Sequence, residues 1–139
     1  MPTVHSSAWH DQWGQLDHSS DPSFFVDFLD YTRGGQRIVA QNNPQQFFAH
    51  LSIEPGQHIL EVACGTGDLT APLAQLVGPE GLVVGLDKSK TMVLEARKRA
   101  GKMDLPLKNM EGMFTRLRYG TKRLDRSRTS PAFQRRGVG

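Results

Sequence analysis

The sequence contains one cysteine, Cys64, among 139 residues. A disulfide within the chain and a zinc site built from several thiolates are therefore excluded. No apolar run approaches the roughly 18 residues of a membrane span, and the first residues lack the basic and apolar regions of a secretory signal. We therefore expect a soluble, cytoplasmic protein without a membrane partner.

The net charge of +3 is small, but it is distributed unevenly. Residues 1–110 carry 9 Lys and Arg against 12 Asp and Glu, whereas residues 111–139 carry 8 against 2. A slightly acidic body is therefore joined to a strongly basic end, and the two parts need separate interpretations.

Helical signals dominate the first third of the chain. Asp21-Pro22 is a helix-start signal, and the apolar residues that follow it predict an amphipathic helix ending at Gly34-Gly35. A second helical stretch is expected over residues 36–51, interrupted or restarted at Asn43-Pro44.

The pattern changes after residue 55 to alternating strands and helices. Short apolar runs predict buried strands at residues 58–63 and 82–86, and a third strand is expected near 107–111. Helices are expected at residues 69–77 and 89–100, the second capped by Ser89. This order predicts an α/β fold, a Rossmann-like parallel sheet that is incomplete, with N-terminal helices and an irregular basic C-terminal tail.

The loop after the first strand carries the chemistry. Residues 61–67 (EVACGTG) contain two glycines, and Asp87 ends the next strand. Such a loop brings backbone N–H groups to the carboxyl edge of a parallel sheet, and the acidic residue can accept hydrogen bonds from ribose hydroxyls. The pattern predicts an adenosine site. A dinucleotide fingerprint would need a third glycine where Thr70 or Asp68 stands.

The same residues resemble motif I of class I S-adenosylmethionine-dependent methyltransferases, in particular the type 11 and ubiquinone/menaquinone C-methyltransferase group. That motif has an acidic residue followed by three small residues at alternate positions, here Glu61, Ala63, Gly65 and Gly67. The resemblance covers about Pro55 to Ala100, so it implies only the N-terminal half of such a fold. We expect a truncated chain, with residues 1–54 as a helical lid or extension, 55–110 as a partial cofactor-binding domain and 111–139 as a disordered or aberrant tail.

The resemblance implies S-adenosylmethionine as cofactor and methyl transfer to a small-molecule acceptor. In the family, Glu61 would lie near the amino-acid end of the cofactor, Asp87 would accept from the ribose, and Lys88 and Met92 would flank the adenine. The implied cofactor-binding residues are Glu61, Ala63, Gly65, Thr66, Gly67, Asp87, Lys88 and Met92. No catalytic residue is implied, because proximity and alignment can supply much of the rate of a direct displacement. A catalytically silent cofactor-binding fragment and an NAD-binding Rossmann oxidoreductase fragment remain alternatives.

Weaker signals have simpler explanations. Cys64 is expected to be a buried packing residue rather than a nucleophile. No metal site is expected, because the candidate ligands share no recognised spacing. These candidates are His5, His10, Asp11, Asp17 and His18. Residues 97–102 carry four cations that we interpret as a solvated helix end.

Two features are left with competing explanations. The aromatic residues Trp9, Trp13, Phe25 and Phe28 either form a lid over an acceptor pocket or anchor an extra helix on the core. The basic end is an aberrant reading frame, an inert extension or a nucleic-acid-binding tail. We favour the first of these three, so nucleic acid is not an expected partner.

Overall fold

The computed structural model describes residues 13–113 and 126–127. A short 3₁₀ segment, η1 (Trp13–His18), is followed by one long helix and two short helical segments. Strands and helices then alternate. The helical elements before the sheet are α2 (Pro22–Asn42), α3 (Pro44–Phe47) and η2 (Ala49–Leu51). The remaining elements are β1 (His58–Val62), α4 (Thr70–Val77), β2 (Leu82–Asp87), α5 (Lys90–Ala100), β3 (Leu107–Glu111) and β4 (Arg126–Ser127).

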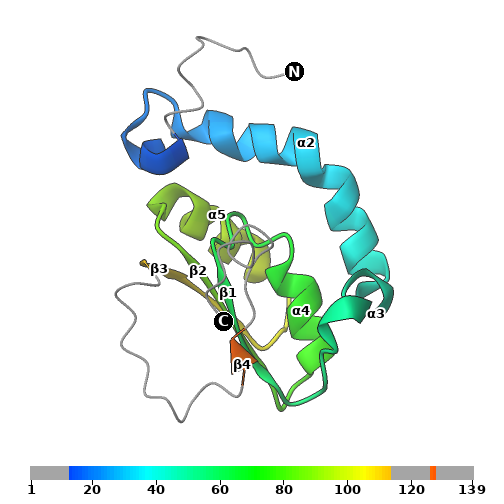
Figure 1. Cartoon of the computed structure of the whole chain (residues 1–139). Coiled ribbons are helices and arrows are strands. Elements are labelled where there is room, and N and C mark those ends of the chain that lie inside the picture. The colour runs from blue at the N-terminus through cyan, green and yellow to red at the C-terminus, as the bar shows by residue number, and fades with distance from the viewer. Residues whose placement is uncertain (1–12, 114–125, 128–139) are drawn as a thin grey trace.

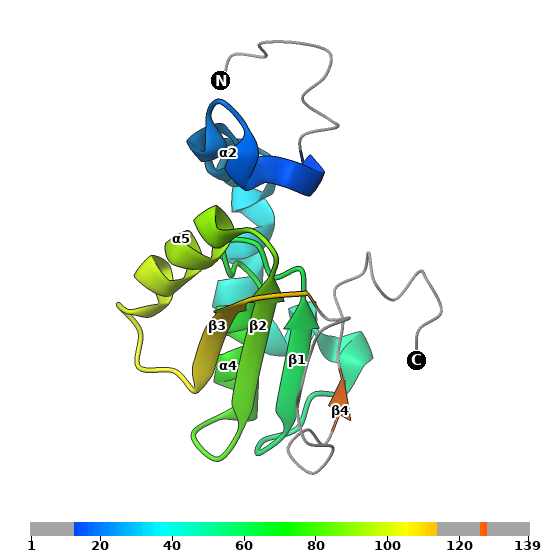
Figure 2. The same cartoon turned by 90° about the vertical axis from the view of Figure 1, so that its left-hand side faces the viewer.

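The strands form one parallel sheet in the order β3-β2-β1-β4 (Figure 2). Strands β1 and β2 pair residue by residue, from His58 with Leu82 to Val62 with Leu86. The connections from β1 to β2 and from β2 to β3 step in the same direction across the sheet. Because both crossovers are expected to be right-handed, α4 and α5 lie on the same face of the sheet.

Alternation along the strands assigns the two faces of the sheet. Ile59 and Val83 pack against α4 through Leu73 and Val77, which forms the core between sheet and helix. A second buried cluster, Leu60, Val84 and Leu86, belongs to the opposite face. The strands are thus apolar on both faces, as the sequence predicts for a parallel sheet.

The predicted strands and the helices of the α/β part are confirmed within a residue or two. Ser89 caps α5 through its side chain, which accepts from the N–H of Met92. Pro72 lies in the first turn of α4, where its missing N–H leaves no intrahelical bond unmade. The fold class predicted from the sequence is confirmed.

The predicted helix end at Gly34-Gly35 is wrong. Helix α2 continues through both glycines to Asn42, and the chain breaks only at Asn43, whose side chain accepts from the N–H of Gln46 and caps α3 (Figure 1). A glycine in a helix costs only about 1 kcal/mol. Arg37, beyond the glycines, pairs with Asp30 of the same helix and with Asp68 of the loop before α4, so an ion pair across the glycines and a tertiary one favour the continued helix.

The N-terminal helices pack on the α/β part. Trp13 meets the rings of Phe25 and Phe28 edge-on at centroid distances of 4.8 and 5.9 Å. Leu16 and Phe25 bury Met92 of α5. These aromatic residues anchor the segment to the core, which is one of the two alternatives that the sequence left open; Trp9 lies outside the described residues.

Candidate functional site at the carboxyl ends of the strands

The loop between β1 and α4 turns through three left-handed residues. Ala63, Gly65 and Gly67 have φ values of 61°, 56° and 82°. A left-handed conformation costs a residue with a Cβ roughly 1–2 kcal/mol, so Ala63 is strained whereas the glycines are not. A Cβ on Gly67 would also lie 3.4 Å from the Cβ of Ala96, so α5 packs closely against the loop. Small residues are therefore required here by the backbone.

Asp87 joins this loop to the start of α5. Its Oδ2 accepts the N–H of Gly65 at 2.9 Å, and its Oδ1 accepts the N–H of Ser89 at 2.9 Å. Each bond fixes one oxygen of the carboxylate at the carboxyl end of β2. A carboxylate offers about four lone-pair sites, so Asp87 is oriented and can still accept from ligand hydroxyls.

Glu61 lies beneath the loop in the core. Its side chain is 5% exposed, and its Oε2 accepts the hydroxyl of Thr70 at 2.6 Å. Burial raises the pKa of Glu61 to about 7; the Thr70 hydrogen bond opposes this shift, and the charges of Asp68 and Asp87 add to it. A cationic ligand group at this loop would favour the ionised form of Glu61.

Asp17 of η1 binds the first turn of α5. Its carboxylate accepts from the Ser89 hydroxyl at 2.7 Å, from the Lys90 N–H at 2.6 Å and from the Thr91 N–H at 2.9 Å. Burial alone would raise the pKa of Asp17, but these hydrogen bonds outweigh it and lower the pKa to about 2. The sequence did not indicate this role for Asp17, which was a candidate only for a metal site, because its partners lie 72–74 residues away along the chain.

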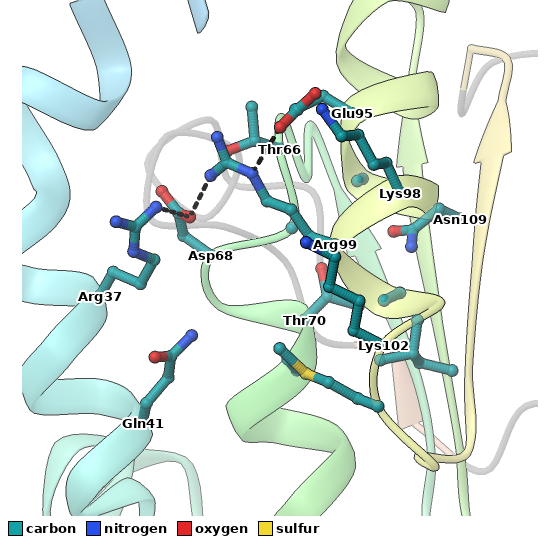
Figure 3. Close-up of a pocket in the computed structure, with 16 residues that line it drawn as sticks. Arg37, Gln41, Thr66, Asp68, Thr70, Glu95, Lys98, Arg99, Lys102 and Asn109 are labelled. Atoms are coloured by element: carbon teal, nitrogen blue, oxygen red, sulfur yellow. Dashed lines mark hydrogen bonds and ion pairs between the residues drawn. The ribbon is translucent and has the colours of Figure 1, made fainter. Parts of the chain in front are cut away.

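An ion-pair network joins α2, the loop and α5 (Figure 3). Arg99 contacts Asp30 at 2.8 Å, Asp68 at 3.4 Å and Glu95 at 3.0 Å. Burial raises the pKa of Asp68, and the charges of Arg37 and Arg99 oppose that shift. The prediction of a solvated cationic helix end is therefore wrong for Arg99, whose side chain is only 23% exposed.

A pocket of about 420 Å³ lies beside this network, and Figure 3 shows the residues that line it. It lies between α2, α4 and α5 and is lined in part by Ala96, Met103 and Asn109. Of the predicted cofactor residues, only Thr66 and Gly67 line it. The pocket therefore lies on the helix side of the β1–α4 loop and does not include Asp87 or Lys88 at the end of β2.

The remaining predicted residues differ in exposure. Lys88 and Ala63 are exposed, Thr66 is buried within the loop, and Met92 is buried beneath Leu16 and the aromatic cluster. The structure places seven of the eight residues at the loop and the ends of β1 and β2, with Glu61 and Thr66 buried, and it places Met92 in the first turn of α5.

Cys64 is buried, and burial strongly raises the pKa of its thiol. The charges of Glu61 and Asp87 raise this pKa further. Its Sγ lies 3.9 Å from Asn109 Oδ1. A thiol that stays protonated is a poor nucleophile, which agrees with the predicted packing role.

The predictions about metal ligands and the basic end concern residues that the structure describes only in part. Within residues 13–113, no group of three or more His, Cys, Asp or Glu residues could hold a metal ion. His5, His10 and Asp11 lie outside the described residues, as does most of the basic end. Of that end, Arg126 and Ser127 pair with Ile59 and Leu60 of β1. No helix in the described ranges has the length and hydropathy of a membrane span.

Comparison with known proteins decides the family. The sequence profile of protein-L-isoaspartate(D-aspartate) O-methyltransferases, PCMT, matches residues 23–121, which is most of the chain. The chain belongs to the PCMT family. Its fold and motif are those of class I S-adenosylmethionine-dependent methyltransferases, as the sequence predicts, and S-adenosylmethionine is the cofactor of this class.

Individual relatives carry different names. A demethylmenaquinone methyltransferase of Symbiobacterium thermophilum is 49% identical over 55 residues, which are 40% of this chain and 22% of that protein. A 23S rRNA (uracil(1939)-C(5))-methyltransferase of Acinetobacter baylyi is 34% identical over 90 residues, 60% of this chain and 19% of that protein. The matched segments thus span about a fifth of these curated relatives.

A solved structure confirms the fold. An S-adenosylmethionine-dependent methyltransferase from Aquifex aeolicus superposes with a TM-score of 0.63 at 20% identity, over 80% of this chain and 57% of that chain. The names of these relatives refer to a quinone and to an RNA, and the family name refers to a protein, so the names do not agree on one acceptor.

The residues at the strand ends fit the cofactor of this class. Asp87 is held by Gly65 and Ser89 and keeps lone pairs that can accept hydrogen bonds from hydroxyl groups. Left-handed glycines let a ligand approach the backbone, and the carboxyl groups of Glu61 and Asp87 suit a cofactor that carries a sulfonium and an ammonium group.

Proposed function

We propose that this PCMT-family chain binds S-adenosylmethionine at the carboxyl ends of β1 and β2. The observation that carries the proposal is the fixed carboxylate of Asp87, whose two oxygens are held by the backbone of Gly65 and Ser89. The proposed contact set is Glu61, Ala63, Gly65, Thr66, Gly67, Asp87, Lys88 and Met92.

Each group has a distinct role in this proposal. Asp87 accepts from the ribose, and Gly65 and Gly67 line the methionine part. Glu61 lies beneath the amino-acid end, where the ammonium group of a bound cofactor favours its ionised form. Lys88 and the inward-turned Met92 support the adenine side. When bound, the cofactor supplies an electrophilic methyl group on its sulfonium, and the chain contributes alignment of this group with the acceptor.

We further propose that the acceptor is a small molecule and that the protein acts in the cytoplasm. The demethylmenaquinone methyltransferase, at 49% identity, supports a small acceptor more than the family name does. In this scheme residues 1–54 form the lid or extension, residues 55–110 the partial cofactor domain and residues 111–139 a basic tail, from which Arg126 and Ser127 pair with β1.

The test is calorimetric titration of the whole chain with S-adenosylmethionine and, separately, with NAD. We expect S-adenosylmethionine to bind and Asp87→Ala to weaken it at least about tenfold, since hydrogen bonds to a charged group contribute roughly 1.5–3 kcal/mol. Asp104→Ala removes an exposed carboxylate outside the site and serves as control. Binding of NAD without S-adenosylmethionine would contradict the proposal.

A second assay addresses chemistry. Transfer of a labelled methyl group from S-adenosylmethionine is measured with a demethylated quinone analogue, an isoaspartyl peptide and ribosomal RNA as acceptors. Transfer to the quinone supports a small-molecule acceptor, and transfer to the peptide or RNA overturns it. Cofactor binding with no transfer to any of them supports the alternative, a catalytically silent cofactor-binding chain.

A further inference from the structure

Ser89 lies between two carboxylates that come from distant parts of the chain. Its N–H donates to Asp87 Oδ1 at 2.9 Å, and its hydroxyl donates to Asp17 Oδ1 at 2.7 Å. The same hydroxyl oxygen accepts the N–H of Met92 at 3.2 Å. Both the backbone and the side chain of Ser89 are therefore fixed, and Asp17 is connected to Asp87 through one residue.

The segment that carries Asp17 is held against α5. Leu16 is 4% exposed and packs with Phe25 and Met92, which places Asp17 over the first turn of the helix. A Cβ on Gly14 would lie 3.7 Å from the Lys88 ammonium, so η1 also passes close to the residue after Asp87. Figure 2 shows η1 beyond the carboxyl ends of the strands, on the side where the loop and Asp87 lie.

We propose that Asp17 is a positioning residue for the cofactor: by holding Ser89, it keeps the carboxylate of Asp87 in the orientation that accepts the ribose hydroxyls. This inference rests on the proposed role of Asp87. It gives the N-terminal segment a function at the cofactor site, in addition to its packing on the core.

Capping of α5 alone does not account for the arrangement. The helix already has its own N-cap, because Ser89 accepts from Met92. Asp17 adds acceptors for the N–H groups of Lys90 and Thr91, and its third bond goes to the residue that binds Asp87. Loss of Asp17 leaves the Ser89 hydroxyl without this acceptor and lets the start of α5 shift relative to the Gly65 loop.

The test is a double-mutant cycle on the whole chain, with S-adenosylhomocysteine as the titrated probe. We expect Asp17→Ala to weaken binding about tenfold, which corresponds to about 1.4 kcal/mol. In the Asp87→Ala background the same change should have no further effect, because the group through which Asp17 acts is gone. Asp27→Ala, which removes an exposed carboxylate from α2, should stay within about twofold of the wild type.

Asp17→Asn separates positioning from charge. Asparagine keeps the oxygen that accepts from Ser89 and Thr91 and loses the acceptor for the Lys90 N–H, which does not lead to Asp87, so we expect affinity within about threefold of the wild type. It also retains most of the segment's contacts and provides a folded variant if Asp17→Ala unfolds.

Three results would overturn the inference. They are unchanged affinity in Asp17→Ala, multiplicative losses in the double variant, and equal losses in Asp17→Asn and Asp17→Ala. Failure of the proposed function is a different result, since it requires that the wild type does not bind the probe or that Asp87→Ala binds it normally. Either of these also overturns the inference about Asp17, because that inference rests on the role of Asp87; the three results above differ from them because the wild type still binds and Asp87→Ala still weakens binding.

Discussion

The buried carboxyl group of Glu61 makes the stability of this protein depend on pH in a direction opposite to that of most acidic residues. Its pKa is raised from 4.5 to about 7, so the folded chain holds a proton that the unfolded chain releases. This contribution to stability is fully present below pH 4.5 and is lost as the pH rises to about 7.

The size of the effect follows from this separation. One pKa unit corresponds to about 1.36 kcal/mol, so the free energy of unfolding should fall by about 3 kcal/mol between pH 4.5 and pH 7.5. Glu61→Gln removes the titration and keeps an oxygen for the Thr70 hydroxyl. Its unpaired amide group costs about 1–3 kcal/mol, so the variant is expected to be less stable than the wild type at pH 4.5 and equal to or more stable than it at pH 7.5.

The assay is urea denaturation of both proteins at half-unit steps from pH 4.5 to 8. The difference between the two curves isolates Glu61, because Asp68, whose pKa is also raised by burial, is present in both proteins. The low pKa of Asp17, about 2, affects stability only below this range. Parallel curves for wild type and variant would refute the assignment of a protonated Glu61.

Two further perturbations test the loop and the ion pairs. Ala63→Gly should raise the free energy of unfolding by up to about 1 kcal/mol, because it removes left-handed strain; Gly67→Ala, which introduces the same strain and a Cβ 3.4 Å from Ala96, should lower it by about 1–2 kcal/mol. Equal losses in both variants by urea denaturation would contradict the loop conformation. Arg99→Gln should cost about 1–3 kcal/mol, since it leaves half-buried carboxylates with one cation fewer, whereas the exposed Lys98→Gln should stay within about 0.5 kcal/mol. If the thermal stability of the two charge variants is equal, the network contributes nothing.

Elements with a strong local pattern were predictable from the sequence. The strands at residues 58–62 and 82–87 are continuous apolar runs, and α5 has a serine cap in front of it. Gly65 and Gly67 were identified from their place in the loop after a strand and from the methyltransferase motif, and the structure shows that both have a left-handed backbone. The helix end at Gly34-Gly35 was predicted wrongly, because the contacts that hold α2 together come from Asp68 and Arg99.

The sequence by itself determined the parallel α/β order, the glycine loop and the acidic residue at the end of β2, because each depends on spacing within one element or one turn. Only the tertiary structure decided which charges meet. Asp17 reaches Ser89 across 72 residues, and Arg99 reaches Asp30 across 69. Such partners are brought together by packing of Leu16 and Phe25 on α5, and no periodicity along the chain records that contact. The partners of these charged side chains therefore could not be predicted from the sequence.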